Sequence, residues 1–396
     1  MIKRTFQLIV NYFEHIDKLF FLLTLTASVY GCILIASMQR DGGVNFLKTQ
    51  ITAVCIGFGV SVLLSRADYR SIARLWLLIA GFALLLTFSV FFVGIQVSGT
   101  DDVGWIRLPG GMTFQPSEIT KVCFIMTFSK HLAYLDETGR LKSFIGVMTL
   151  LLHGMIPAAL IHIQGDDGAA LVFVLMFIIM SFAAGVQLRY FIFLGVIITA
   201  ALPLLWFRVL NIDQKSRLTA LFSSDDSMFM TYGWQQYQGR ISISSGGMFG
   251  RGLFHGTRVE RNAVPYQEND FIFTVAGEEL GFIGCIAIVL ILAFVLLRVL
   301  IIAGRTKDLL GRSICIGFFA LTASQVMLNL GMVLGLLPVI GVTLPFFSSG
   351  GTSAACICLC TGLVQSVYAT QNGTVMHRRS VSQGRLLRVR TSGAHR

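Results

Sequence analysis

A short acidic stretch beside a long apolar segment is the first place where this sequence could do chemistry. In YQENDFIFTVAGEELGFIG (residues 266–284), Asp270 stands at the start of an apolar segment, and Glu278 and Glu279 follow about two helical turns later. Inserting a charged side chain into a membrane costs about 2.5–3.5 kcal/mol, so each carboxylate needs a reason to be there. On a straight helix, the two glutamates lie roughly 12–14 Å deeper than Asp270. Glu278 then needs a partner such as Lys121 or an arginine.

A glutamate and a lysine three residues apart form the second candidate, in FQPSEITK (residues 114–121). Pro116 suits the first turn of a helix. Glu118 then lies near the positive end of the helix, and Lys121 lies on the same face. Such a pair orients one helix against its neighbours or contacts an anionic ligand, and both roles stay open.

Two adjacent aspartates are the third candidate, in QGDDGAAL (residues 164–171). Asp166 and Asp167 lie between two apolar segments, where either can cap the N-terminus of the following helix. Capping alone and a functional role are equally good interpretations.

Two glycine-rich blocks complete the candidates. Residues 232–258 combine glycines, which allow close backbone approach, with aromatic, Gln, Arg and Ser side chains that suit sugars and polar head groups. They match no nucleotide-binding fingerprint. Residues 329–351 form an apolar region that Pro338 and Pro345 interrupt, with Ser348 nearby. This pattern predicts an outer turn or a re-entrant segment shielded by protein.

The elements that must position these residues are membrane helices. Apolar residues make up 55% of the 396, and charged residues only 13%, against about 25% in soluble proteins. Apolar segments of about 20 residues, the length of a spanning helix, recur along the chain. We expect an all-α, polytopic membrane protein with ten transmembrane helices. They are predicted over residues 19–38, 47–65, 73–94, 116–135, 143–163, 168–185, 190–208, 270–300, 312–333 and 350–370.

The distribution of Lys and Arg predicts the orientation. These residues favour the even-numbered loops and both ends, which places both termini in the cytoplasm. The long loops at about 95–115 and 209–269, the latter between helices 7 and 8, then face outward. Residues 1–371 form a single membrane domain, and residues 372–396 form a basic cytoplasmic tail. The net charge of +11 includes six tail arginines, which indicates contact with anionic membrane lipid and not with nucleic acid.

Five blocks, in this order, resemble the signature blocks of the SEDS family (shape, elongation, division and sporulation). The blocks are FQPSEITK, QGDDGAAL, SGGMFGRGL, NDFIFTVAGEELGFIG and NLGMVLGLLPVIGVTLPFFSSGG. The resemblance covers nearly the whole chain. The short N-terminal segment and short tail favour the elongation type over the division and sporulation types.

The resemblance implies a peptidoglycan glycosyltransferase of the bacterial cytoplasmic membrane, which polymerises lipid II at the outer face and works with a class B penicillin-binding protein. The family's essential aspartate falls on Asp270, the expected general base. A divalent cation, Mg²⁺ or Mn²⁺, bridging carboxylate and phosphate is a further expectation. The residues expected to contact substrate are Lys121, Glu118, Asp166, Arg217, Arg240, Glu278, Glu279 and Ser348.

Several positions depart from the family pattern. They are Gly104 for an arginine, Gly165 for a proline, Asp167 for a leucine, Tyr266 for a glutamate, Asn269 for a threonine and Ser349 for a tyrosine. No His or Cys pair completes a zinc signature, so the sequence leaves the metal unknown.

Two other functions fit the same features. Buried carboxylates and an interrupted last region also suit a flippase that moves the lipid-linked precursor across the membrane. A membrane scaffold that positions a transpeptidase is the other alternative.

Overall fold

The structure, a computed structural model, describes residues 14–39, 45–96, 103–107, 113–210, 212–221 and 233–372. This part of the chain is mostly helical, and nine of its helices are long and apolar enough to cross a membrane. The nine are α2 (Lys18–Met38), α3 (Phe46–Arg66), α5 (Trp76–Val93), α7 (Phe144–Ile163), α8 (Asp167–Ala184), α9 (Leu188–Leu204, continued by the π-helical turn η1, Leu205–Val209), α14 (Ile272–Arg305), α15 (Leu309–Val333) and α16 (Gly351–Gln371). A mostly helical, polytopic architecture is therefore confirmed for the described residues. The basic tail predicted over 372–396 lies, apart from Asn372, outside the described residues.

The predicted segment 116–135 forms a helix of a different character, α6 (Pro116–Glu137). It is less apolar than the nine, because its first turns carry the buried Glu118 and Lys121. Further along, Phe124 stacks on Phe128 with ring centroids 4.9 Å apart. α6 is thus a central helix, where neighbouring helices cover its polar side chains.

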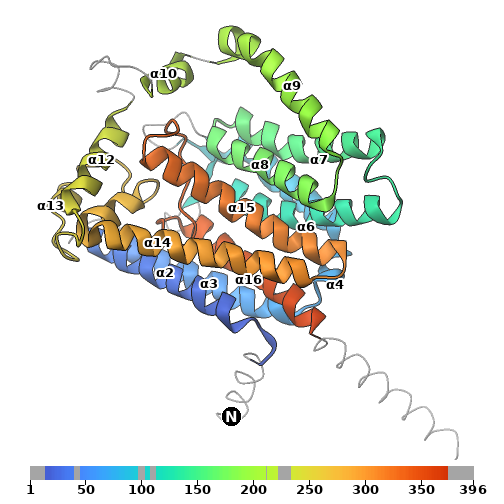
Figure 1. Cartoon of the computed structure of the whole chain (residues 1–396), viewed down its shortest axis with the longest axis horizontal. Helices are drawn as coiled ribbons and strands as arrows, with labels where there is room; N and C mark the ends of the chain where they lie inside the picture. Colours follow the sequence, from blue (N-terminus) through green and yellow to red (C-terminus); the bar gives the residue numbers. More distant parts are fainter. Residues whose placement is uncertain are drawn as a thin grey trace, which may run out of the picture.

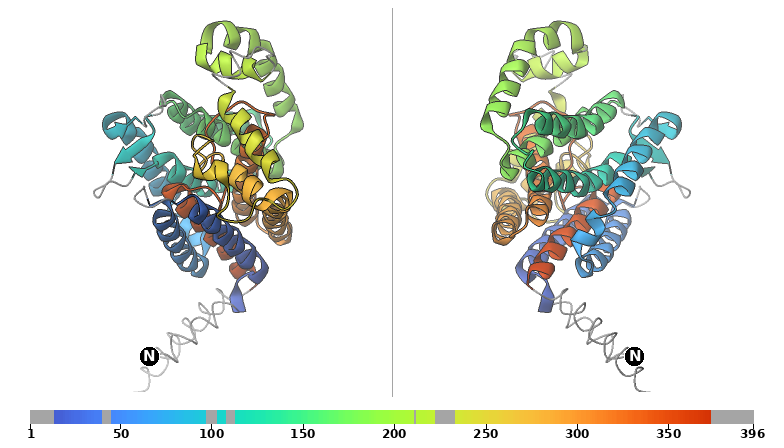
Figure 2. Two further views of the ribbon diagram at one scale, coloured as in Figure 1. Left: turned by 90° about the vertical axis from the view of Figure 1, so that its left-hand side faces the viewer. Right: turned by 90° about the vertical axis from the view of Figure 1, so that its right-hand side faces the viewer.

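The helices form a bundle whose middle is α6 and α15 (Figures 1 and 2). α15 contacts α6, α8 and α14, and α14 also packs on α2. α16 runs along α3. α9 stands at the edge, contains no buried residue and leans away from α7 and α8 (Figure 1). The bundle therefore separates a buried centre, made by α6 and α15, from helices that face the surroundings.

The connections carry short elements. Strands β1 (Gly94–Ile95), β2 (Trp105–Arg107) and β3 (Thr113–Phe114) pair antiparallel in that order just before α6. The predicted loop 209–269 contains helices where it is described. The short helices are α4 (Tyr69–Ala73), α10 (Ile212–Ala220), α12 (Trp234–Gly246) and α13 (Thr257–Glu260).

Helix α14 is bent just after the acidic pair Glu278 and Glu279. Gly281 has φ 66° and ψ −159°, so a short helix ends there and a second one runs on to Arg305. The glycine-rich block packs against this bend, since a Cβ on Gly246 would lie 2.0 Å from the carbonyl oxygen of Gly277. Those glycines serve close packing of the chain on itself. Glu279 lies beside Ser37, near the C-terminal end of α2, and its expected depth in the membrane stays a prediction.

The segment between α15 and α16, residues 334–350, is irregular, as its prolines predicted. Phe346 and Phe347 are nevertheless buried. α2 approaches them closely at Gly31, where a Cβ would lie 2.6 Å from the carbonyl oxygen of Phe346. Protein therefore shields residues 342–349 of this irregular backbone, which is the condition for such backbone inside a membrane protein, whereas residues 334–341 are more exposed.

Glycine also sets the contact between α3 and α16. A Cβ on Gly57 would lie 2.6 Å from the carbonyl oxygen of Ala355, and one on Gly362 would lie 2.6 Å from the carbonyl oxygen of Ser61. Small residues at a helix interface let backbones approach and gain van der Waals contact. Gly59, on the same helix as Gly57, has open space at this position.

Replacing Gly57 with valine is expected to destabilise the protein, because the new methyl groups must push α16 away. Overpacking of this kind costs about 1–3 kcal/mol. The purified protein should show an apparent melting temperature several degrees lower. The matched variant Gly59→Val should melt close to wild type, and equal melting of the two variants would contradict this account of the interface.

Candidate active site

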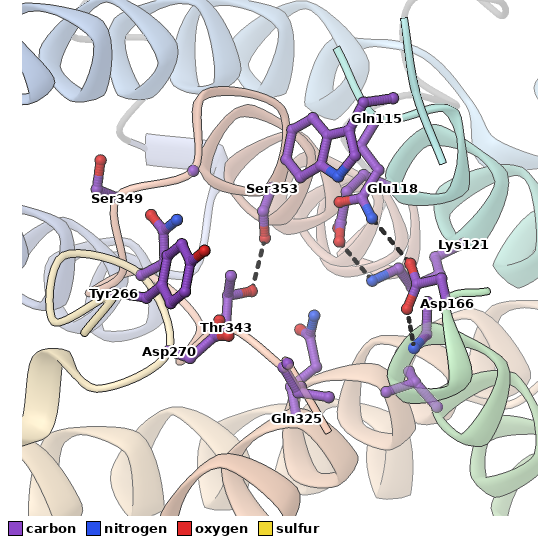
Figure 3. A pocket seen from close by; sticks show the side chains of 17 residues that line it. Gln115, Glu118, Lys121, Asp166, Tyr266, Asp270, Gln325, Thr343, Ser349 and Ser353 are labelled. Carbon is purple, nitrogen blue, oxygen red and sulfur yellow. Dashed lines mark hydrogen bonds and ion pairs between the residues drawn. The ribbon is translucent and has the colours of Figure 1, made fainter. Parts of the chain in front are cut away.

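A cavity of about 180 Å³ lies where α6, α8 and α16 begin, and Figure 3 shows it from close by. Side chains from β2, α6, α8, α15, α16, the 334–350 segment and the turn before α14 line it. Four predicted site residues are among them: Glu118, Lys121, Asp166 and Asp270. Segments separated by about 150 residues of sequence thus contribute charge to one cavity.

Asp270 lies in the turn before α14, two residues ahead of the helix and not at its predicted first position. The side-chain amide of Asn329 on α15 holds this turn. Its Nδ2 donates to the carbonyl oxygen of Asp270 at 2.7 Å and to that of Val342 at 2.7 Å. One buried amide therefore ties the Asp270 turn to α15 and to the 334–350 segment.

Two serines of the 334–350 segment support the same turn from the other side. Ser348 Oγ donates to the carbonyl oxygen of Asn269 at 2.6 Å and accepts a bond from the Leu344 N–H at 2.7 Å. The Ser349 N–H donates to the carbonyl oxygen of Glu268 at 2.8 Å. Ser348 thus fixes backbone behind the cavity, and its predicted contact with substrate stays a prediction.

The Asp270 carboxyl group is set up to titrate near neutral pH. It opens on the cavity but is otherwise surrounded by protein. Burial disfavours its charged form, and the neighbouring Glu268 carboxylate adds repulsion, so its pKa rises from 3.8 to about 7. A base whose pKa is close to the working pH can take up a proton and release it again.

Lys121 and Glu118 form an ion pair on the opposite side of the cavity from Asp270 (Figure 3). Lys121 Nζ lies 2.6 Å from Glu118 Oε1, and the side chains are 2% and 9% exposed. The predicted pairing on one face of the helix is confirmed. An ammonium group has three donors, so the pair leaves Lys121 with donors for a ligand in the cavity.

The two carboxylate oxygens of Asp166 accept different hydrogen bonds, one that caps a helix and one at the cavity wall. Its Oδ1 accepts from the Ala169 N–H at 2.8 Å, which caps α8 as predicted. Its Oδ2 accepts from Gln115 Nε2 at 2.8 Å, at the cavity wall. The adjacent Asp167 instead accepts a bond from Gln214 Nε2 at 2.6 Å. Only the first aspartate of the pair reaches the cavity.

The two arginines that were predicted to contact substrate, Arg217 and Arg240, do not line the cavity. Arg217 Nη1 donates to the carbonyl oxygen of Val339 at 3.3 Å, and the Arg240 guanidinium lies beside Gly335. Both arginines therefore lie near the 334–350 segment, while the cavity is lined by other residues of it. Their contact with a diphosphate stays a prediction.

The prediction of a lysine or arginine partner for Glu278 is wrong. In the described residues, its partners are backbone N–H groups, those of Arg258 at 2.8 Å and Val259 at 3.0 Å. Glu279 accepts a bond from the hydroxyl of Ser37. Both carboxylates fasten α13 and α2 to the bend in α14, and their expected substrate contact stays a prediction.

Several lining residues were not singled out from the sequence. They are Trp105, Gln115, Gln325, Thr343 and Ser353. Gln325 had a usable signal, because it is an amide inside an apolar helix, four residues before Asn329. Among the departures from the family pattern, Tyr266, Asn269 and Ser349 also line the cavity.

The cavity offers a limited donor set for a metal ion. In the described part of the chain, no three His, Cys, Asp or Glu side chains gather as a metal site. Glu118 and Asp166 already have partners. The residues present therefore fit Mg²⁺ or Mn²⁺ only in the mode in which one carboxylate, here Asp270, and substrate phosphates hold a hydrated ion.

Fold and site together define a polytopic membrane protein with an ionisable, polar chamber at one end of its helical bundle. Residues 14–373 match the FtsW, RodA and SpoVE family, described as cell cycle proteins. The chain belongs to this family.

Similar proteins cover nearly all of the chain. A probable peptidoglycan glycosyltransferase FtsW from Geobacter sulfurreducens is 32% identical over 92% of this chain and 98% of its own. The peptidoglycan glycosyltransferase MrdB of Escherichia coli is 28% identical over 93% and 96%. The crystal structure of the rod shape determining protein RodA from Thermus thermophilus has a TM-score of 0.64 at 25% identity, covering 89% and 96%. A solved peptidoglycan synthase complex, described as coordinating polymerization and crosslinking, contains a chain with a TM-score of 0.74 at 25% identity, covering 89% and 97%.

The Glu118–Lys121 pair provides a test that separates folding from function. Lys121→Met leaves a buried carboxylate without its partner, and breaking such a pair costs about 3–5 kcal/mol. The melting temperature should therefore fall clearly. The double variant Glu118→Gln/Lys121→Met removes both charges and should regain most of the stability. If Lys121 contacts an anionic substrate, the double variant stays inactive, whereas recovered activity would assign the pair to folding alone.

Proposed function

We propose that this protein is a peptidoglycan glycosyltransferase of the bacterial cytoplasmic membrane, which polymerises lipid II at the outer face. The carrying observation is Asp270, a carboxylate with a pKa near 7 that faces a polar cavity across from a lysine. The relatives named as peptidoglycan glycosyltransferases at 28–32% identity support the activity.

The proposed topology has ten spans. α6 is the tenth, packed against α5, α7, α8, α15 and α16, and both termini are cytoplasmic. The cavity, α12 and α13 then belong to the outer side, where the sugars of a lipid-linked precursor are exposed. The proposal covers a role in elongation or in division, because relatives named FtsW and MrdB are both similar over nearly the full length.

Asp270 is the proposed general base. It takes the proton from the acceptor sugar's hydroxyl as that oxygen attacks the donor's anomeric carbon, with inversion. The bond from this carbon to the polyprenyl diphosphate breaks, and the diphosphate leaves with the electron pair. Lys121 supplies positive charge for the leaving group inside a partly dehydrated cavity, where such charge acts strongly. A bound Mg²⁺ or Mn²⁺ would add positive charge at the same phosphates.

A class B penicillin-binding protein is the proposed partner. Support comes from the similar chain found in a solved peptidoglycan synthase complex. A scaffold role is compatible with the enzyme, whereas a flippase would move lipid II without forming glycan. An assay that follows translocation and polymer formation separately distinguishes these functions.

Asp270→Asn should abolish polymerisation of lipid II by the purified, folded protein. The amide has the same size but cannot accept a proton, and loss of a general base costs about 100-fold or more in rate. Glycan formation measured by gel or chromatography is the readout. Glu268→Gln, which changes a neighbouring carboxylate that does not line the cavity, is the matched control and should remain active. Wild-type rates for Asp270→Asn would refute this role.

The rate should also depend on pH in a specified direction. Because burial raises the pKa of Asp270 to about 7, the carboxyl group is protonated and inactive as a base below that pH. In the free enzyme, kcat/KM should fall as pH is lowered through about 7 and level off above it. Glu268→Gln removes part of the repulsion, so it should move this inflection to lower pH. A profile that is flat from pH 5 to 8 would contradict the assignment.

A further inference from the structure

Gln325 is a buried amide that the proposed mechanism does not use. It lies on α15 within the middle of the bundle, and only 3% of the residue is exposed. Figure 3 shows it between Asp270 and Thr343 on one side and Lys121 and Asp166 on the other. Gln325 is the residue through which α15 lines the cavity.

The amide of Gln325 has no hydrogen-bond partner among the described residues, and it is directed into the cavity (Figure 3). Its neighbours behave differently. Asn329, one helical turn further along α15, uses its amide nitrogen for two carbonyl groups, and Gln115 donates to Asp166. Buried polar groups are almost always hydrogen-bonded. An amide that protein leaves free at a cavity wall is therefore available to whatever fills the cavity.

The side chains that line the cavity indicate which chemical class of ligand it suits. Besides Gln325, the cavity lining includes the hydroxyl groups of Thr343 and Ser353, which bond each other at 3.1 Å, and the indole of Trp105. An amide donates and accepts at the same time, so an acetamido or hydroxyl group can use both functions, whereas a diphosphate, which only accepts, can use the donor alone. The positive charge that suits a diphosphate is on a different side chain, Lys121.

We infer that Gln325 is a binding residue for the sugar part of the substrate, through a hydrogen bond from its amide to an acetamido or hydroxyl group of an N-acetylated amino sugar. This inference rests on the proposed function and extends it. Lys121 and Gln325 then divide recognition, the lysine contacting the diphosphate and the amide contacting the sugar beside Asp270.

The test replaces Gln325 with methionine, which has a similar size but no donor or acceptor. Thr322→Val is the matched control, because Thr322 lies on the same helix, is fully buried, has a hydroxyl without a partner and does not line the cavity. Both are made in the full chain carrying Asp270→Asn, so that no substrate is consumed. Binding is followed through the rise in melting temperature with ligand concentration.

Two probes separate the parts of the substrate: undecaprenyl diphosphate, and the same lipid carrying the N-acetylated disaccharide without its peptide. Losing one hydrogen bond should weaken binding of the disaccharide lipid by about tenfold. Binding of undecaprenyl diphosphate should stay within about twofold, and Thr322→Val should bind both probes like its parent.

Two results would overturn the inference: unchanged affinity of Gln325→Met for the disaccharide lipid, or an equal loss for both probes. Polymerisation of lipid II by the wild-type chain is measured in parallel. If wild type polymerises lipid II and Gln325→Met binds normally, only the inference fails. If wild type neither polymerises lipid II nor binds the disaccharide lipid, the proposed function fails together with it.

Discussion

The side-chain amide of Asn329 gives one nitrogen to two carbonyl groups, those of Asp270 and Val342, and the site depends on this arrangement. Without it, the turn that carries Asp270 and the irregular 334–350 segment would each leave a buried carbonyl unpaired. Such a group costs about 1–3 kcal/mol. Because α15 is packed against α6, α8 and α14, the amide transfers the rigidity of the bundle centre to a turn. The turn that carries Asp270 is thereby tied to a packed helix.

Different partners offset the free-energy cost of burying each carboxylate, and these partners indicate the role of each residue. Glu118 is neutralised by Lys121, and Glu278 accepts two backbone N–H groups of α13. Asp270 has Glu268 as its charged neighbour and retains a raised pKa. A carboxylate that the fold stabilises fully serves the structure, whereas one that the fold leaves poorly stabilised remains reactive. Asp270 is the second kind.

Local sequence patterns predicted much of this structure, whereas contacts between segments distant in the sequence could not be predicted from them. Helix positions followed from apolar length, and the Glu118–Lys121 pair followed from spacing on one helix. The bend at Gly281 could not be predicted, because the sequence does not distinguish a glycine with positive φ from any other glycine in an apolar segment. The expected cationic partner of Glu278 was wrong for a separate reason: its carboxylate accepts backbone N–H groups of α13, a contact that spacing on one helix does not predict. Gln115, Gln325 and Thr343 meet only after folding, so no sequence window contains the cavity.

The account places proton transfer, leaving-group charge and sugar recognition in one cavity. The most direct measurement is an experimental structure of the purified protein with lipid II bound. The account predicts an acceptor hydroxyl within about 3.2 Å of the Asp270 carboxylate, with the diphosphate on the Lys121 side of the same cavity. Sugars seated elsewhere, with Asp270 beyond the reach of any hydroxyl or bridging water, would contradict it.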